Sequence, residues 1–149
     1  MNKEEILEHE HNYMLWLDTL QEFSEERAML PYAEGKWSPN EIVMHLAEWD
    51  RFTLEERLPY MKEGEKLETF PNFESFNANA AARAHEQTFK ETISYAKKQR
   101  QFIIEQLRKK DEVEWDKEFS IGMHTLSIRK YFADFIDHDL HHKNQISNK

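Results

Sequence analysis

The sequence contains no cysteine, and this absence removes several kinds of site at once. Disulfides, thiolate metal ligands and a cysteine nucleophile are all excluded. Any metal ion would therefore be held by histidine, aspartate or glutamate. The first residues, Met1-Asn2-Lys3-Glu4-Glu5, are acidic and lack the apolar run of a signal peptide, and no segment approaches the roughly 20 apolar residues of a membrane span. We expect a cytoplasmic protein.

A basic surface is also lacking, because 29 acidic residues outnumber 20 lysines and arginines and give a formal net charge of -9. No cluster of lysines and arginines stands out except the short run Arg108-Lys109-Lys110. Binding to nucleic acids and to anionic membranes both depend on a basic face. We expect neither as a partner, and expect a small-molecule substrate instead.

Glycine and proline are scarce, with 3 and 4 residues in a chain of 149. The long segments between them show helical periodicity, and 13% of the residues are aromatic, enough for one packed core. We predict an all-α fold, a four-helix bundle that forms a single domain over residues 1–149.

Four long helices are expected over residues 2–29, 39–63, 88–110 and 127–146. The clearest start is Ser38-Pro39-Asn40-Glu41, with serine as N-cap, proline at the first helical position and glutamate at N3. Residues 64–72 are predicted to be a loop. The alanine-rich range 73–84 is predicted to be a short extra helix in the crossover between the second and third long helices.

Two histidines four residues apart lie on the apolar stripe of the last predicted helix. His138 and His142 continue the line of Phe135 and Ile146, whereas His141 turns about 100° away towards solvent. Two imidazoles at this spacing can bring ring nitrogens to one cation, as in helical zinc sites. The pair alone is more typical of partly exposed histidines near a helix end.

A third inward histidine, His45, lies beside Ile42 and Trp49 on the second predicted helix. A single histidine there is more often a hydrogen-bonded core residue than a ligand. Three neutral imidazoles buried together without partners are costly, however, and a divalent metal ion satisfies all of them. We predict a metal site formed by His45, His138 and His142. Three ligands leave a position open for water or substrate, as in catalytic sites.

Three polar residues near the histidines are candidates for a chemical role. Glu48 or Asp134 could act as a general base towards a metal-bound water. Asp134 precedes His138 by one helical turn, so it is also a candidate hydrogen-bond partner of that histidine. Gln145 follows His142 by one turn and could bond a ligand or a metal-bound water, although a polar helix end is an equally good interpretation.

For several other acidic and aromatic residues, a purely structural role is an alternative to a functional one. Asp137 and Asp139 are expected, with Asp134, on a solvated acidic face. Trp16, Trp49 and Tyr131 could line a pocket, but aromatic residues at helical spacing are more often core.

Two blocks of sequence resemble the DinB/YfiT-like metalloprotein superfamily. Residues 35–50, GKWSPNEIVMHLAEWD, are similar to the family's turn, capped second helix and first metal histidine. Residues 138–146, HDLHHKNQI, are similar to its C-terminal HxxxHxxQ pattern. Helix order, chain length and the separation of the blocks agree as well. Asn144 departs from the pattern, because many relatives carry glycine between the last histidine and the glutamine.

The resemblance implies a four-helix bundle, often a homodimer, with nickel or zinc on His45, His138 and His142. Characterised members are metal-dependent transferases and isomerases that use low-molecular-weight thiols such as bacillithiol, mycothiol or glutathione. The stretch 73–84 is also similar to a subset that includes a cyclopropane-hydrolysing self-resistance enzyme. The family name comes from DNA-damage induction and implies no DNA binding.

Our leading functional hypothesis is a transferase that joins a low-molecular-weight thiol to an electrophile, with the metal ion lowering the thiol pKa. One alternative is a hydrolase that uses metal-bound hydroxide. Another is a non-catalytic protein that binds a small molecule. The remaining interpretation is a helical protein whose histidines only satisfy polarity in the core.

Overall fold

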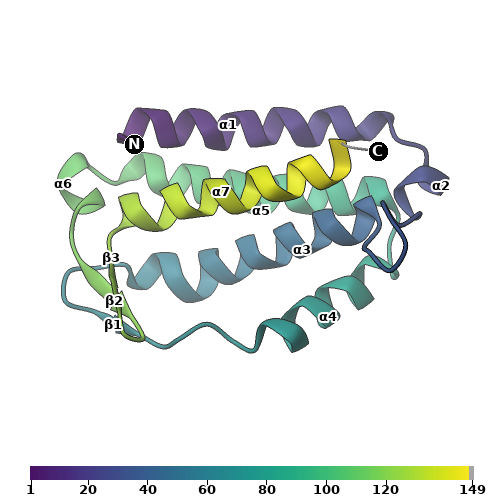
Figure 1. The fold of residues 1–149 in the computed structure, drawn as a ribbon. Helices are drawn as coiled ribbons and strands as arrows, with labels where there is room; N and C mark the ends of the chain where they lie inside the picture. The colour runs from purple at the N-terminus through teal and green to yellow at the C-terminus, as the bar shows by residue number, and fades with distance from the viewer. Residues whose placement is uncertain (148–149) are drawn as a thin grey trace.

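The computed structural model describes residues 1–147 and consists mainly of helices (Figure 1). The four long helices are α1 (Lys3–Thr19), α3 (Pro39–Phe52), α5 (Phe89–Lys109) and α7 (Ile128–Ser147). α1 and α7 run in one direction and α3 and α5 in the other (Figure 1). The crossover from α3 to α5 therefore returns along the bundle, and it carries α4 (Phe73–Ala84). The predicted bundle with a short crossover helix is confirmed.

Side-chain caps define where the long helices begin. Each of the first three starts with a reciprocal capping box, in which the cap side chain accepts from the N3 amide and the N3 glutamate accepts from the cap amide. The pairs are Asn2–Glu5, Ser38–Glu41 and Thr88–Glu91.

Within residues 1–147, no helix is both long and apolar enough to cross a membrane.

The first helix ends earlier than predicted. Its α-helical hydrogen bonding stops at Thr19 rather than near residue 29, and the 3₁₀ turn η1 (Leu20–Glu22) and the short helix α2 (Glu25–Ala28) follow. Phe23 adopts an extended conformation between them, and the Ser24 side chain accepts a hydrogen bond from the amide of Arg27. Ser24 therefore caps a new helix and ends the predicted one.

The second helix also differs from the prediction of residues 39–63. Regular α-helix ends at Phe52, after which the chain continues as a π-helical turn, η2 (Thr53–Arg57), and a 3₁₀ turn, η3 (Leu58–Tyr60). Pro59 has no amide hydrogen to donate to the carbonyl four residues earlier, so the regular hydrogen-bond ladder cannot continue through this segment.

A small sheet joins the predicted loop at 64–72 to the stretch between the third and fourth long helices, for which no strand was predicted. β1 (Lys66–Leu67) pairs in parallel with β2 (Phe119–Ile121), which pairs antiparallel with β3 (His124–Leu126). The short helix α6 (Glu112–Trp115) precedes β2. Gly122 turns the hairpin with φ +58, and a Cβ atom there would lie 2.5 Å from Cγ2 of Thr69. Glycine therefore lets the hairpin sit against the crossover.

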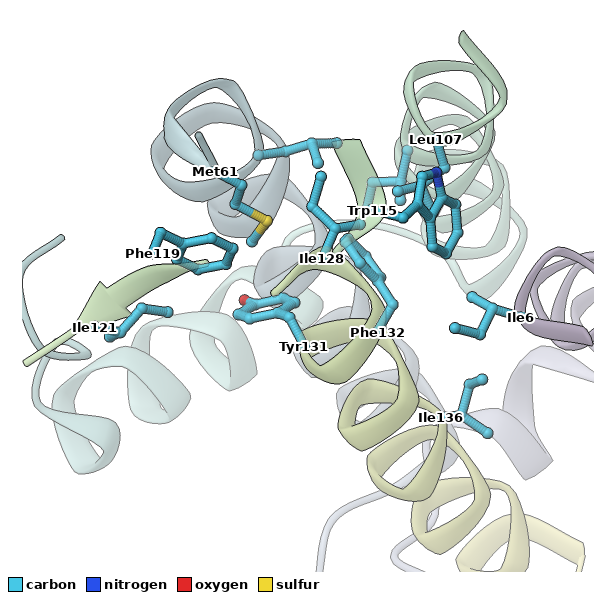
Figure 2. Packing of buried hydrophobic residues seen from close by; sticks show 12 residues of the cluster. Ile6, Met61, Leu107, Trp115, Phe119, Ile121, Ile128, Tyr131, Phe132 and Ile136 are labelled. Atoms are coloured by element: carbon cyan, nitrogen blue, oxygen red, sulfur yellow. The ribbon is translucent and has the colours of Figure 1, made fainter. Parts of the chain in front are cut away.

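The apolar core has two large clusters along the bundle and a small one of Met44, Ala80 and Ala84 between α3 and α4. The cluster at the sheet end packs Trp115, Phe119 and Phe132 with Met61 and Ile6 (Figure 2). The second cluster is formed by the other halves of the long helices, including Tyr13, Leu17, Ile42, Leu46 and Ile93. Charged side chains occupy the layer between the two clusters.

Arg100 is the centre of this charged layer and is 0% exposed. Its guanidinium donates to both oxygens of Asp50 at 2.8 and 2.9 Å, to both oxygens of Asp139 at 2.7 and 2.9 Å, and to Glu10 at 3.0 Å. The ring of Tyr13 stacks on it at 3.6 Å. The Arg100 cluster (Glu10, Asp50, Arg100 and Asp139) thus takes one residue from each long helix. Asp139 is buried, so its predicted place on a solvated face is wrong.

The excess of carboxylates in the Arg100 cluster predicts a pH-dependent stability. Burial raises the pKa of Glu10 to about 7 and that of Asp50 to about 6, against the pull of Arg100. The folded protein therefore holds more protons than the unfolded chain, and these groups lower the free energy of unfolding as pH rises through this window. Between pH 5 and pH 8, the free energy of unfolding should fall less in Glu10→Gln than in the wild type, as measured by urea unfolding. An equal fall in the free energy of unfolding in both proteins would contradict this prediction.

Candidate metal centre

The three predicted histidines meet at one point between α3 and α7. Nε2 of His138 lies 3.4 Å from Nε2 of His45 and 3.2 Å from Nε2 of His142. Two nitrogens bound at about 2.0–2.1 Å to one tetrahedral ion are themselves about 3.3–3.4 Å apart. The ring nitrogens therefore already have the spacing of ligands around a single ion, and the donor set fits zinc or nickel.

Burial keeps these imidazoles neutral. It is the largest cause that lowers the pKa of His45 to about 3 and that of His142 to about 4, and it also lowers the pKa of His138. A positive charge on one ring would further disfavour protonation of its neighbours. At neutral pH each ring therefore offers an unprotonated nitrogen, the form that binds metal ions.

Gln145 determines which nitrogen of His142 carries the proton. Its Oε1 lies 2.6 Å from Nδ1 of His142, and its amide nitrogen donates to the Tyr32 hydroxyl at 3.1 Å. Because an amide oxygen only accepts, Nδ1 is the protonated nitrogen and Nε2 directs its lone pair towards the other histidines. Of the two interpretations of Gln145, the structure shows the bond to His142. Tyr32 was missed, since no sequence spacing relates it to Gln145.

The other candidate residues occupy different surroundings. The buried carboxylate of Glu48 accepts from Arg51 at 2.8 Å and from Arg83 at 2.6 Å, so two cations already pair with it. Asp134 is exposed and lines the cavity that His138 also lines. His141 is exposed, as the helical stripe predicts. Asp134 is thus the candidate base that faces open space next to the histidines.

A cavity of about 620 Å³ opens beside the histidines. His45 and His138 form part of its wall, together with Trp49 and Tyr131, two of the three aromatic residues proposed for a pocket. Trp16 instead packs against the second core cluster. Sequence reasoning missed Lys130 and Phe135 of α7 as lining residues. The other missed residues come from the crossover, α4 and the β2–β3 hairpin: Phe70, Phe73, Asn77, Ile121, Met123, His124, Thr125 and Leu126.

The fold and the histidines together define a helical-bundle protein with a candidate three-histidine metal centre. The family model described as DinB superfamily matches residues 8–146, so the chain belongs to the DinB superfamily. The resemblance noted in the sequence is confirmed.

The fold is similar to that of a solved structure with 13% sequence identity. It is described as YfiT from Bacillus subtilis, a probable metal-dependent hydrolase with an unusual four-helix bundle topology. The TM-score is 0.81, and the match covers 98% of this chain and 84% of that one. Among curated proteins, none matches this sequence.

Proposed function

We propose that this chain is a metal-dependent enzyme in which His45, His138 and His142 hold one divalent ion, zinc or nickel. The observation that carries the proposal is the convergence of three Nε2 atoms, with neighbouring separations of 3.2 and 3.4 Å. The description of the similar YfiT structure as a probable metal-dependent hydrolase supports the same class of protein.

The reaction we propose is the transfer of a low-molecular-weight thiol to an electrophile. A divalent ion supplies a lowered thiol pKa, so that a thiolate exists at neutral pH. The chain contains no cysteine, so the thiol has to come from a small molecule such as bacillithiol, mycothiol or glutathione. The cavity beside His45 and His138 lies within the range of about 300–1,000 Å³ typical of ligand sites.

The second candidate function is hydrolysis, and the position of Asp134 favours it. A hydrolase needs a group that takes a proton from water, and Asp134 is the carboxylate that lines the cavity beside His138. The third candidate is a binding protein that captures a small molecule without turnover. We also propose a homodimer, on the family resemblance alone, which sedimentation tests. The cytoplasmic location stays a proposal that cell fractionation tests.

The test is a conjugation assay with metal-loaded protein, each of the three thiols and 1-chloro-2,4-dinitrobenzene. We expect a thioether product that requires both metal and thiol, is lost in His142→Ala and is retained in His141→Ala. Cleavage of 4-nitrophenyl acetate with metal but without thiol would instead support the hydrolase. Absence of both activities in protein that holds its metal would leave the binding protein.

Gln145 offers a more graded test of the metal site. Gln145→Leu should weaken metal binding about 10- to 100-fold, because His142 loses the hydrogen bond that orients its ring and selects its tautomer. Competition with a chelating dye measures the affinity. Asn144→Leu is the matched control, since Asn144 is the exposed neighbour on the same helix. Equal affinities of the two variants would contradict the role of Gln145.

A further inference from the structure

One wall of the cavity is a continuous group of aromatic rings. The aromatic shelf consists of Trp49, Phe70 and Phe73, which all line the cavity. Ring centroids of Trp49 and Phe73 lie 5.5 Å apart, and those of Phe70 and Phe73 lie 5.9 Å apart. Phe76 supports the shelf from behind, with its centroid 4.1 Å from that of Trp49. Aromatic surfaces of this kind bind other flat apolar groups by stacking and edge contacts.

Two rings of the shelf are open to solvent, whereas Trp49 is buried. Phe73 is 57% exposed and Phe70 is 38% exposed, and Met123 at the hairpin tip also lines the cavity and is fully exposed. Apolar surface gathered around a cavity typically marks a binding site. A ligand on the shelf would remove this surface from water, which is the main favourable term in apolar binding.

Hydrogen bonds and a cation hold the shelf in place. Nε1 of Trp49 donates to Oδ1 of Asn77 at 3.1 Å, which orients the indole from α4. The guanidinium of Arg57 lies 5.0 Å from the ring centres of Phe52 and Phe70, and it donates to the carbonyl of Glu68 at 2.6 Å. Contacts from α4 and from Arg57 therefore fix the positions of the shelf rings, so a ligand would bind to a preformed surface.

The remaining wall of the cavity combines apolar side chains with two charged residues. From α7 and the hairpin it presents Tyr131, Phe135 and Leu126, with the rings of Tyr131 and Phe135 inclined at only 20° to each other. The charged lining residues are Lys130 and Asp134, which lie one turn apart on α7 and carry opposite signs. Lys130 and Asp134 balance each other, so these two residues add no net charge to the wall.

We propose that the cavity binds a flat apolar ring system on the aromatic shelf, with one edge of the ring at His45. The inference rests on the proposed function in one respect: the ring belongs to the substrate that meets the three histidines. The ring site restricts the proposed substrates to electrophiles that are attached to an aromatic or similarly planar apolar group. Trp49 and Phe73 determine this specificity.

The experiment uses the neutral fluorescent probe N-phenyl-1-naphthylamine and the whole protein as purified. We expect saturable binding to the wild type, and binding about tenfold weaker or worse in Phe73→Ser, since this change removes a stacking face and its apolar area. Phe102→Ser on α5 is the matched control, because Phe102 is 41% exposed but does not line the cavity. Unsaturable binding, or equal binding by both variants, would overturn the proposal.

Competitors test the flat shape directly. The planar 2-naphthol should displace the probe at a lower concentration than the globular 1-adamantanol, and equal displacement would overturn the planar preference. The probe assay does not depend on the metal ion, and probe binding should persist in His142→Ala. Probe binding without any metal uptake would therefore overturn the proposed function alone, whereas metal uptake without probe binding would overturn only the ring site.

Discussion

Arg100→Met should lower the free energy of unfolding by about 3–5 kcal/mol at pH 8. The substitution removes the guanidinium that pairs with Glu10, Asp50 and Asp139, so these buried carboxylates lose that countercharge. A loss of this size should reduce the melting temperature by about 10 °C or more. Because the Arg100 cluster joins all four long helices, it also sets the position of α3 against α7 and so of His45 against the other two histidines.

Chemical denaturation at two pH values distinguishes this explanation from a simple packing defect. The loss should be smaller at pH 5 than at pH 8, because Glu10 and Asp50, whose pKa values burial raises to about 7 and about 6, can then take up protons. The control is Arg129→Met, which removes ion pairs to the exposed residues Asp116 and Glu112 and should cost less than about 1 kcal/mol. Equal losses in the two variants, or a pH-independent loss, would contradict the account.

His142→Ala should weaken metal binding by more than about 100-fold, beyond the usual effect of losing an outer hydrogen-bond partner. It removes one of the three converging Nε2 atoms, and the cavity-lining His138 keeps only His45 as a neighbour at 3.4 Å. Competition with a chelating dye measures the affinities for zinc and nickel. His141→Ala is the matched control on the same helix, because His141 is exposed and should change affinity less than twofold. Similar losses in both variants would mean that the metal lies elsewhere.

Local signals in the sequence account for the parts of the fold that could be predicted. The run Ser38-Pro39-Asn40-Glu41 defines the start of α3. Its capping box and its proline at N1 lie within four consecutive residues, so the sequence alone is enough to recognise them. The crossover helix at 73–84 has the predicted bounds. The spacing of His138 and His142 places both rings on the inward face of α7 for the same reason, since helical periodicity is a local property.

Contacts between distant residues account for most of what the sequence could not show. Asp139 was assigned to a solvated face because its partner, Arg100, lies 39 residues away and no local pattern links them. Glu48 looked free to act as a base, but Arg83, 35 residues further along, pairs with it. The strands are two or three residues long, too short for an alternating pattern, and only pairing across the chain reveals them.

Some residues that line the cavity could be predicted from helical periodicity, whereas others are placed there only by the tertiary structure. Trp49 and Tyr131 could be named in advance because they share helical faces with the histidines. Phe70 and Phe73 could not, because the crossover has to fold back along α3 before their rings reach Trp49. The substrate preference proposed for the aromatic shelf therefore follows from the tertiary structure alone.

The most direct test of the three-histidine site is the metal content of the purified, untagged protein, measured by elemental analysis beside His45→Ala. The α3 histidine is decisive, because the site exists only if the bundle brings His45 to the pair on α7. We expect about one zinc or nickel ion per chain in the wild type and almost none in the variant. A wild-type protein that holds no metal, even after incubation with zinc and nickel, would contradict this expectation.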